Sequence, residues 1–189
     1  MSAIDVSSAA GLVAVGVLTA NILLGLLISS GYNPTRRWPR RRIKLFPFHK
    51  WTGYSALAVA FVHPVILLFS STARFRPLDI AFPIWSPTQP FENTLGAIAL
   101  YLVAFAVLTS YFRYAIGFRR WKVFHYTTYA AAAVFYVHGV LADPLLQNGP
   151  VDFVDAEKVY VEACLLLAAA ATVWRFRARR RRRVVVRVD

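Results

Sequence analysis

Residues 48–64 read FHKWTGYSALAVAFVHP, and this stretch places two histidines, His49 and His63, in largely apolar sequence. The block that contains most of it, residues 51–70, is nearly free of charge and matches the ~20 residues that a helix needs to cross a bilayer. Ionisable side chains are costly inside a bilayer, and where they occur they usually mark a functional site. The stretch therefore predicts a membrane-spanning helix that carries functional histidines.

Four further apolar blocks of similar length lie at residues 9–29, 95–112, 123–141 and 159–174. The chain of 189 residues is 58% hydrophobic and has a mean hydropathy of +0.49. An ordinary soluble domain is only about 45–50% apolar, so this composition excludes one. We therefore expect an all-α integral membrane protein, a bundle of about five transmembrane helices, with no room for a soluble catalytic domain.

Positive charge is concentrated in three segments, because residues 31–50, 113–122 and 175–187 hold 19 of the 22 Lys and Arg residues. With five spans, all three segments fall on the same side of the membrane. Cytoplasmic loops carry the excess of Lys and Arg, which predicts an external N-terminus and a cytoplasmic C-terminus. The expected parts of this multi-pass plasma-membrane protein are the external residues 1–8, the transmembrane domain 9–175 and the Arg-rich cytoplasmic tail 176–189.

The arginine-rich end of the chain has two interpretations. It can lie on anionic membrane lipid, where each base near the surface contributes ~1 kcal/mol. It can also form a docking patch for an acidic cytoplasmic partner. Nucleic acid is not expected as a partner, although the net charge is +13, because no recognition pattern with interleaved aromatic residues accompanies the arginines.

The four histidines of the chain form two matched pairs, His49 with His63 on one block and His125 with His138 on another. Each pair spans ~20 Å along its helix at 1.5 Å per residue. Because both helices run the same way through the membrane, His49 and His125 share an inner level, and His63 and His138 share an outer level. Two imidazoles on facing helices are arranged to hold a haem iron from both sides.

Other metal sites fit this pattern poorly. Two histidines with no carboxylate or thiolate at the same depth make an incomplete zinc or copper site. The single cysteine, Cys164, excludes the C-x-x-C-H signature of c-type haem.

The two histidines of a pair are expected on the same face of their helix for one pair only. At ~100° per residue, a spacing of 14 returns His63 to within ~40° of His49, whereas a spacing of 13 leaves His138 ~140° from His125. Either the second helix is tightened locally, or its two rings reach their irons from opposite flanks. Pro64 should also bend the first helix, because it removes one backbone hydrogen bond near His63.

The spacings His-x13-His and His-x12-His on alternate helices, with Phe48-His49-Lys50 and Val137-His138-Gly139, resemble the ferric-reductase-like transmembrane domain. This family includes NADPH oxidases, ferric reductases and the haem-binding membrane subunit of bacterial methionine-sulfoxide reductase systems, and the resemblance covers about residues 10–175. It implies that His49, His63, His125 and His138 ligate two b-type haems. It also implies that electrons pass from a cytoplasmic flavin through both haems to an external acceptor.

Two departures from the family pattern shape the expected activity. The usual domain has six helices, whereas five apolar blocks occur here. Larger members continue into a flavin and nicotinamide domain, and no Gly-rich dinucleotide loop lies outside the apolar blocks of this sequence. We therefore expect an electron-transfer subunit of an oxidoreductase that depends on the flavin of a separate cytoplasmic reductase.

Basic residues near each level are candidates for binding haem propionates, because arginine matches a carboxylate geometrically. The inner candidates are Arg36, Arg37, Lys50, Arg119 and Arg120. The outer candidates, Arg74 and Arg76, could instead bind an anionic ferric chelate. The alternative for the inner residues is that they only set the orientation of the protein in the membrane.

The leading functional hypothesis is transmembrane electron transfer to an external acceptor or partner protein. One alternative is a quinol-oxidising cytochrome b, for which no quinone pocket is evident in the sequence. Another is a haem-free membrane anchor or transporter component, in which the histidines hold helices together by hydrogen bonds.

Overall fold

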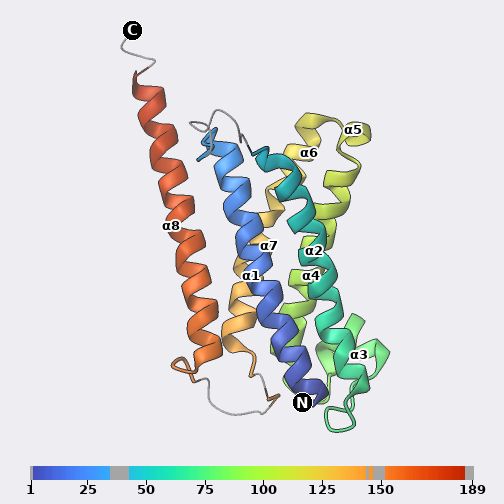
Figure 1. Ribbon diagram of the computed structural model, residues 1–189. Helices are drawn as coiled ribbons and strands as arrows, with labels where there is room; N and C mark the ends of the chain where they lie inside the picture. Colours follow the sequence, from blue (N-terminus) through green and yellow to red (C-terminus); the bar gives the residue numbers. More distant parts are fainter. Residues whose placement is uncertain (1, 35–42, 144, 147–151, 186–189) are drawn as a thin grey trace.

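The structure, a computed structural model, describes residues 2–34, 43–143, 145–146 and 152–185, with side chains as far as residue 178. The bundle is made up of long helices that run along a common axis in Figure 1. They are α1 (Ala3–Ser30), α2 (Leu45–Ile66), α4 (Pro90–Tyr111), α7 (Thr127–Leu141) and α8 (Ala156–Val185). No strand occurs in the described part of the chain, so the prediction of an all-α membrane protein is confirmed.

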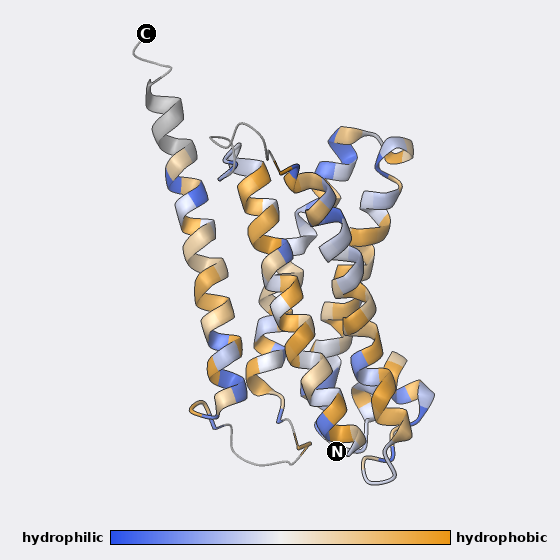
Figure 2. Cartoon of the chain, in the orientation of Figure 1, coloured by the Kyte–Doolittle hydropathy of each residue, from blue (hydrophilic) through white to orange (hydrophobic). Residues whose placement is uncertain are grey.

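Within the described residues, four helices are long and apolar enough to cross a membrane: Ala3–Ser30, Leu45–Phe69, Pro90–Tyr111 and Ala156–Ala178. Figure 2 shows hydrophobic residues along the length of the bundle, and many large apolar side chains are exposed on its surface, among them Phe61 and Leu166. An exposed apolar surface of this extent is suited to contact with lipid.

The fifth predicted span, residues 123–141, differs from the expectation because it is shared between two helices. The short helix α6 (Phe118–His125) ends where α7 begins, and α7 has only 15 residues. At the junction, the Tyr126 amide donates to the Val123 carbonyl at 3.1 Å, and the Tyr129 amide to the Tyr126 carbonyl at 3.1 Å. These are three-residue steps of the 3₁₀ type, so the helix is tightened locally.

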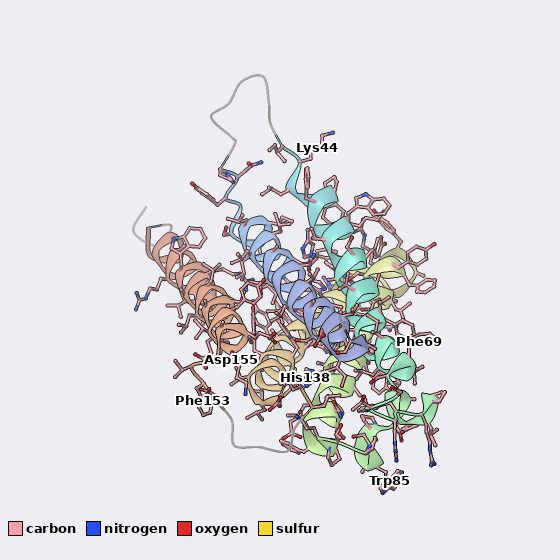
Figure 3. All side chains as sticks on the ribbon, turned by 60° about the horizontal axis from the view of Figure 1, so that its bottom comes forward. Lys44, Phe69, Trp85, His138, Phe153 and Asp155 are labelled. Atoms are coloured by element: carbon pink, nitrogen blue, oxygen red, sulfur yellow. The ribbon has the colours of Figure 1, made fainter. Side chains whose placement is uncertain are left out.

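Short helices close both ends of the bundle. The turn η1 (Leu67–Phe69), α3 (Pro77–Ala81) and η2 (Pro83–Trp85) connect α2 to α4, and α5 (Arg113–Ile116) connects α4 to α6. In Figure 3, Lys44 lies at the end of the bundle opposite Phe69 and Trp85. α2 ends two residues after Pro64 and continues as the 3₁₀ turn η1.

The bundle consists of two helix pairs, α1 with α2 and α4 with α7, and α8 packs against α1 and α7. Buried side chains such as Val15, Phe135 and Val161 form the core where α1, α7 and α8 meet. The Tyr136 hydroxyl lies 2.8 Å from Thr19 Oγ1 and donates to the Cys164 carbonyl at 3.3 Å, so one side chain links three helices. This packing determines which faces of α2 and α7 meet inside the bundle.

Candidate functional site

The inner histidines, His49 on α2 and His125 at the end of α6, lie opposite each other. Their ring centres are 6.3 Å apart, with the planes at 85°. A metal ion bound between two imidazoles at the usual metal–nitrogen distance of about 2.0 Å would separate the ring centres by about 6 Å. Both rings line a cavity of about 440 Å³. The separation and the space therefore suit a metal held from two sides.

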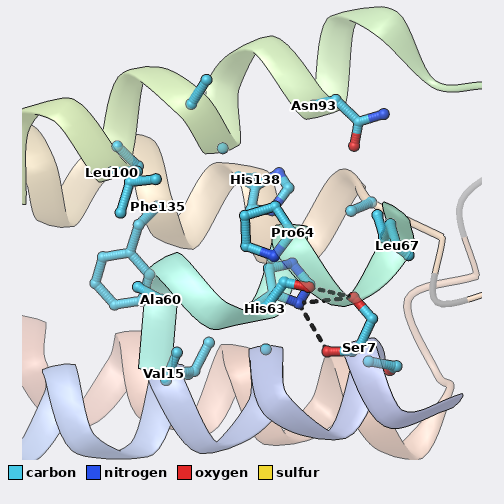
Figure 4. Close-up of a pocket in the computed structure, with 18 of the residues that line it drawn as sticks. Ser7, Val15, Ala60, His63, Pro64, Leu67, Asn93, Leu100, Phe135 and His138 are labelled. Carbon is cyan, nitrogen blue, oxygen red and sulfur yellow. Dashed lines mark hydrogen bonds between the residues drawn. The ribbon is translucent and has the colours of Figure 1, made fainter. Parts of the chain in front are cut away.

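The outer histidines, His63 on α2 and His138 on α7, line a second cavity of about 190 Å³. Figure 4 shows both rings beside Pro64, with Ser7 bonded to His63 from the neighbouring helix α1. The structure thus brings together the two pairs of histidines that were expected to share a level. One member of each pair comes from α2, and the other comes from the α6–α7 segment.

Backbone carbonyls on α1 and α4, the first helices of the two helix pairs, orient three of the four histidine rings. The Nδ1 atom of His63 lies 2.7 Å from the Ser7 carbonyl oxygen, and that of His49 lies 3.1 Å from the Asn21 carbonyl oxygen. The Nδ1 atom of His138 lies 2.8 Å from the Glu92 carbonyl oxygen. A carbonyl only accepts, so Nδ1 carries the proton in each ring and Nε2 keeps its lone pair. Three rings are therefore prepared to ligate a metal through Nε2.

A glycine follows each of these three carbonyls, one helical turn further along the same helix. A Cβ atom on Gly11 would lie 3.1 Å from His63 Cε1, and one on Gly25 would lie 3.2 Å from His49 Cε1. A Cβ on Gly96 would lie 2.9 Å from His138 Cε1, closer than real Cβ contacts come. The glycines therefore let the rings approach the backbone. These glycines were not among the predicted site residues, although Gly11 and Gly25 have the same spacing as His49 and His63.

Among the inner basic candidates, Lys50 lines the inner cavity, and so does Arg113, which was not a candidate. Arg119 and Arg120 are exposed on α6 and are not among the described residues that line this cavity. Arg36 and Arg37 lie outside the described residues. Lys50 also lies over the rings of Trp51 and Tyr54, at 6.0 and 5.7 Å from their centres.

At the outer cavity, neither Arg74 nor Arg76 is among the described lining residues. The Arg76 amide instead donates to Asp79 Oδ2 at 2.8 Å at the start of α3. The base that does line the cavity is Lys158 on α8, which is only 4% exposed. Lys158 carried no signal in the sequence, because a lone lysine near a helix end is ordinary.

No cluster of three or more His, Cys, Asp or Glu side chains able to hold a metal ion occurs among the described residues. In this part of the chain, the candidate ligands for a metal are therefore pairs of histidines. A haem brings its own four equatorial nitrogens and takes only axial ligands from the protein, so a pair is sufficient for it. The paired rings, the free Nε2 atoms of three of them and the two cavities fit this cofactor.

The described residues form an all-helical membrane bundle in which the histidines are paired at two levels. Residues 10–136 match the family described as ferric reductase like transmembrane component, and the chain belongs to this family. The match includes His49, His63 and His125 and ends just before His138. No curated protein and no solved structure gives a match.

Membership in this family makes the chain a multi-pass membrane protein with a ferric-reductase-like transmembrane domain, and a plasma-membrane location is consistent with it. Proteins of this family generally bind haem. They usually act with a redox partner in a lipid membrane.

Proposed function

We propose that this protein carries electrons across the membrane through two b-type haems, one between His49 and His125 and one between His63 and His138. The observation that carries the proposal is the pair of cavities, each lined by two histidines from different helix pairs. Haem supplies a one-electron carrier at each level. The protein's part is to hold each ring with Nε2 toward the cavity and to exclude water from the space between the helices.

Basic side chains of the chain would hold the haem carboxylates. At the inner cavity, the lining residues Lys50 and Arg113 support this role best, because carboxylates pair well with ammonium and guanidinium groups. Arg119 and Arg120, which are exposed on α6, remain candidates in the same proposal, and so do Arg36 and Arg37, which lie outside the described residues. At the outer cavity, buried Lys158 takes the role that was expected of Arg74 and Arg76.

The charge distribution supports a direction for the electrons. In the proposed orientation, the Arg-rich loops and tail face the cytoplasm and attract an acidic flavin reductase, which raises the rate of encounter. On the opposite side, acidic residues cluster around the last loop, namely Asp143, Asp152, Asp155, Glu157 and Glu162. This charge favours a cationic metal species or a basic partner protein as the external acceptor.

The decisive experiment is a pyridine-haemochrome assay on the purified protein, together with a reduced-minus-oxidised absorption spectrum. Two b-type haems per chain are expected. One haem would mean that one histidine pair only links helices, and no haem would leave the protein as a membrane anchor.

A second experiment tests the direction of transfer. In sealed vesicles of known orientation, a flavin reductase added to the Arg-rich side should reduce both haems, and the rate should fall as salt rises, because exposed charges are screened over ~10 Å at 0.1 M salt. Reduction from the opposite side only would reverse the proposed direction.

A further inference from the structure

In the part of the chain that the structure describes, no backbone carbonyl bonds to Nδ1 of the fourth histidine, His125, as carbonyls do at the other three. On α1, the two acceptor carbonyls belong to Ser7 and Asn21. The same sequence spacing, counted from Glu92 along α4, reaches the carbonyl of Ala106. That carbonyl instead accepts a hydrogen bond from Ser110 Oγ at 2.7 Å. Ser110 stands one helical turn after Ala106, where the other three sites have glycine. Its hydroxyl oxygen lies 3.4 Å from His125 Nδ1.

The hydrogen bonds of the Ser110 hydroxyl are completely assigned by its surroundings. The indole Nε1 of Trp121, which can only donate, bonds to Ser110 Oγ at 3.2 Å. A hydroxyl has one proton and two lone pairs, and the proton is used by the Ala106 carbonyl. His125 Nδ1 must therefore donate to the remaining lone pair. Nε2 of His125 is then the nitrogen left for a ligand.

Trp121 fixes the same ring from a second direction. Its indole is stacked on His125, with ring centres 5.1 Å apart and planes at 27°. Both rings lie on α6, one helical turn apart, and the bond from Trp121 to Ser110 ties α6 to α4. His125 is thereby held although the helix changes type directly after it.

We propose that Ser110 is the positioning residue of the inner site. Its hydroxyl connects the Ala106 carbonyl to His125 through two hydrogen bonds and thereby sets how strongly His125 donates to the iron. The inference rests on the proposed function, because it assumes that His125 ligates a haem. A hydrogen bond from Nδ1 makes an imidazole a stronger donor to the metal. At 3.4 Å this bond is longer than its three counterparts, at 2.7, 2.8 and 3.1 Å. His125 is therefore the weakest donor of the four histidines.

Two variants should shift the inner haem potential in opposite directions. Ser110→Ala removes the acceptor and keeps the Cβ, so His125 becomes a weaker donor and the ferrous form is favoured. Ser110→Gly recreates the arrangement of the other three sites, so the ring can bond directly to the Ala106 carbonyl and the ferric form is favoured. We expect about a tenfold change in the reduction equilibrium each way, equivalent to ~59 mV for one electron.

The measurement is a potentiometric titration of both haems in the purified protein. Ser110→Thr keeps the hydroxyl and should restore the wild-type potential. Thr109→Ala is the matched control, because Thr109 also donates to the Ala106 carbonyl, at 3.2 Å, but has no bond to His125. It should leave both potentials unchanged, and the outer haem should not shift in any variant.

The proposal is overturned if Ser110→Ala and Ser110→Gly shift the inner haem in the same direction, or if neither differs from Thr109→Ala. Either result would mean that Ser110 only packs against its neighbours. Failure of the proposed function gives a different result, namely a wild-type protein from which His125→Ala removes no haem.

Discussion

The two helix pairs of the bundle, α1 with α2 and α4 with the α6–α7 segment, present histidines in related but unequal ways. In each, the first helix has two acceptor carbonyls with the same spacing, Ser7 and Asn21 in one pair and Glu92 and Ala106 in the other. On α2 the two histidines repeat this spacing. On the α6–α7 segment they are closer together by a single position, and a tight turn at Tyr126 lies between them.

The tight turn explains how a shorter spacing reaches the same levels. Fourteen residues of α-helix rise about 21 Å, and thirteen residues that include one 3₁₀ turn at about 2.0 Å per residue also rise about 21 Å. The same turn rotates His138 about 60° back toward the face of His125, because each 3₁₀ residue turns about 120° instead of 100°. Equal depth therefore does not require equal spacing when a helix changes type.

The largest effect is expected when one histidine of a level is removed, whichever helix pair carries it. His63→Ala and His138→Ala should each lose the outer haem completely, because each removes one of its two axial ligands. The residual absorption spectra of the two variants should coincide and show one haem per chain. His49→Ala serves as the control that leaves the other haem. Different residual spectra for the first two variants would refute pairing by level.

A change of length at the tight turn tests whether that turn compensates for the shorter spacing. Insertion of one alanine after Tyr126 gives the segment the same histidine spacing as α2, so a regular helix can reach both levels and two haems should remain. Deletion of Thr127 shortens the segment further, so it can no longer reach both levels and should lose the outer haem. Haem content per chain is the measurement, and loss of haem on insertion would contradict the compensation.

A smaller effect is expected from crowding the glycines that face the rings. Gly96→Ala places a Cβ 2.9 Å from His138 Cε1 and should weaken haem retention about tenfold, as displaced partners of metal ligands typically do. Gly25→Ala, at 3.2 Å from His49 Cε1, should have a smaller effect. Gly139→Ala is the control, since its Cβ would meet Val161 at 3.1 Å instead of a histidine. Haem loss during dialysis provides the readout.

The smallest effect concerns the bond that joins the two helix pairs. Tyr136→Phe removes the hydroxyl that lies 2.8 Å from Thr19 Oγ1, so the free energy of unfolding should fall by about 1 kcal/mol. Thermal unfolding in detergent measures it, and haem absorption should not change. Thr19→Ala should cost a similar amount, and the double variant should show that the two effects are not additive. Additive effects would mean that the two hydroxyls do not interact.

The sequence alone was sufficient to predict the four long apolar helices, and the depth that it predicts for the histidines follows from helical rise. A backbone in lipid must satisfy its own polar groups, so long apolar blocks such as residues 9–29 can only be helices. The constant rise per residue of an α-helix then determines the depth of His49 and His63. The block at residues 123–141 was predicted as one span, because the tight turn at Tyr126 has no breaker residue to mark it.

The tertiary structure alone decided what holds each ring. Every helical residue has a carbonyl, so no residue type marks Ser7, Asn21 or Glu92 as an acceptor, and only the packing of α1 on α2 and of α4 on α7 selects them. Ser110 and Lys158 were inconspicuous for the same reason, since their roles come from the side chains and the cavity that face them across the bundle. Hydropathy and helical rise are local properties and can be derived from a segment, whereas a contact between helices depends on how two segments are rotated against each other.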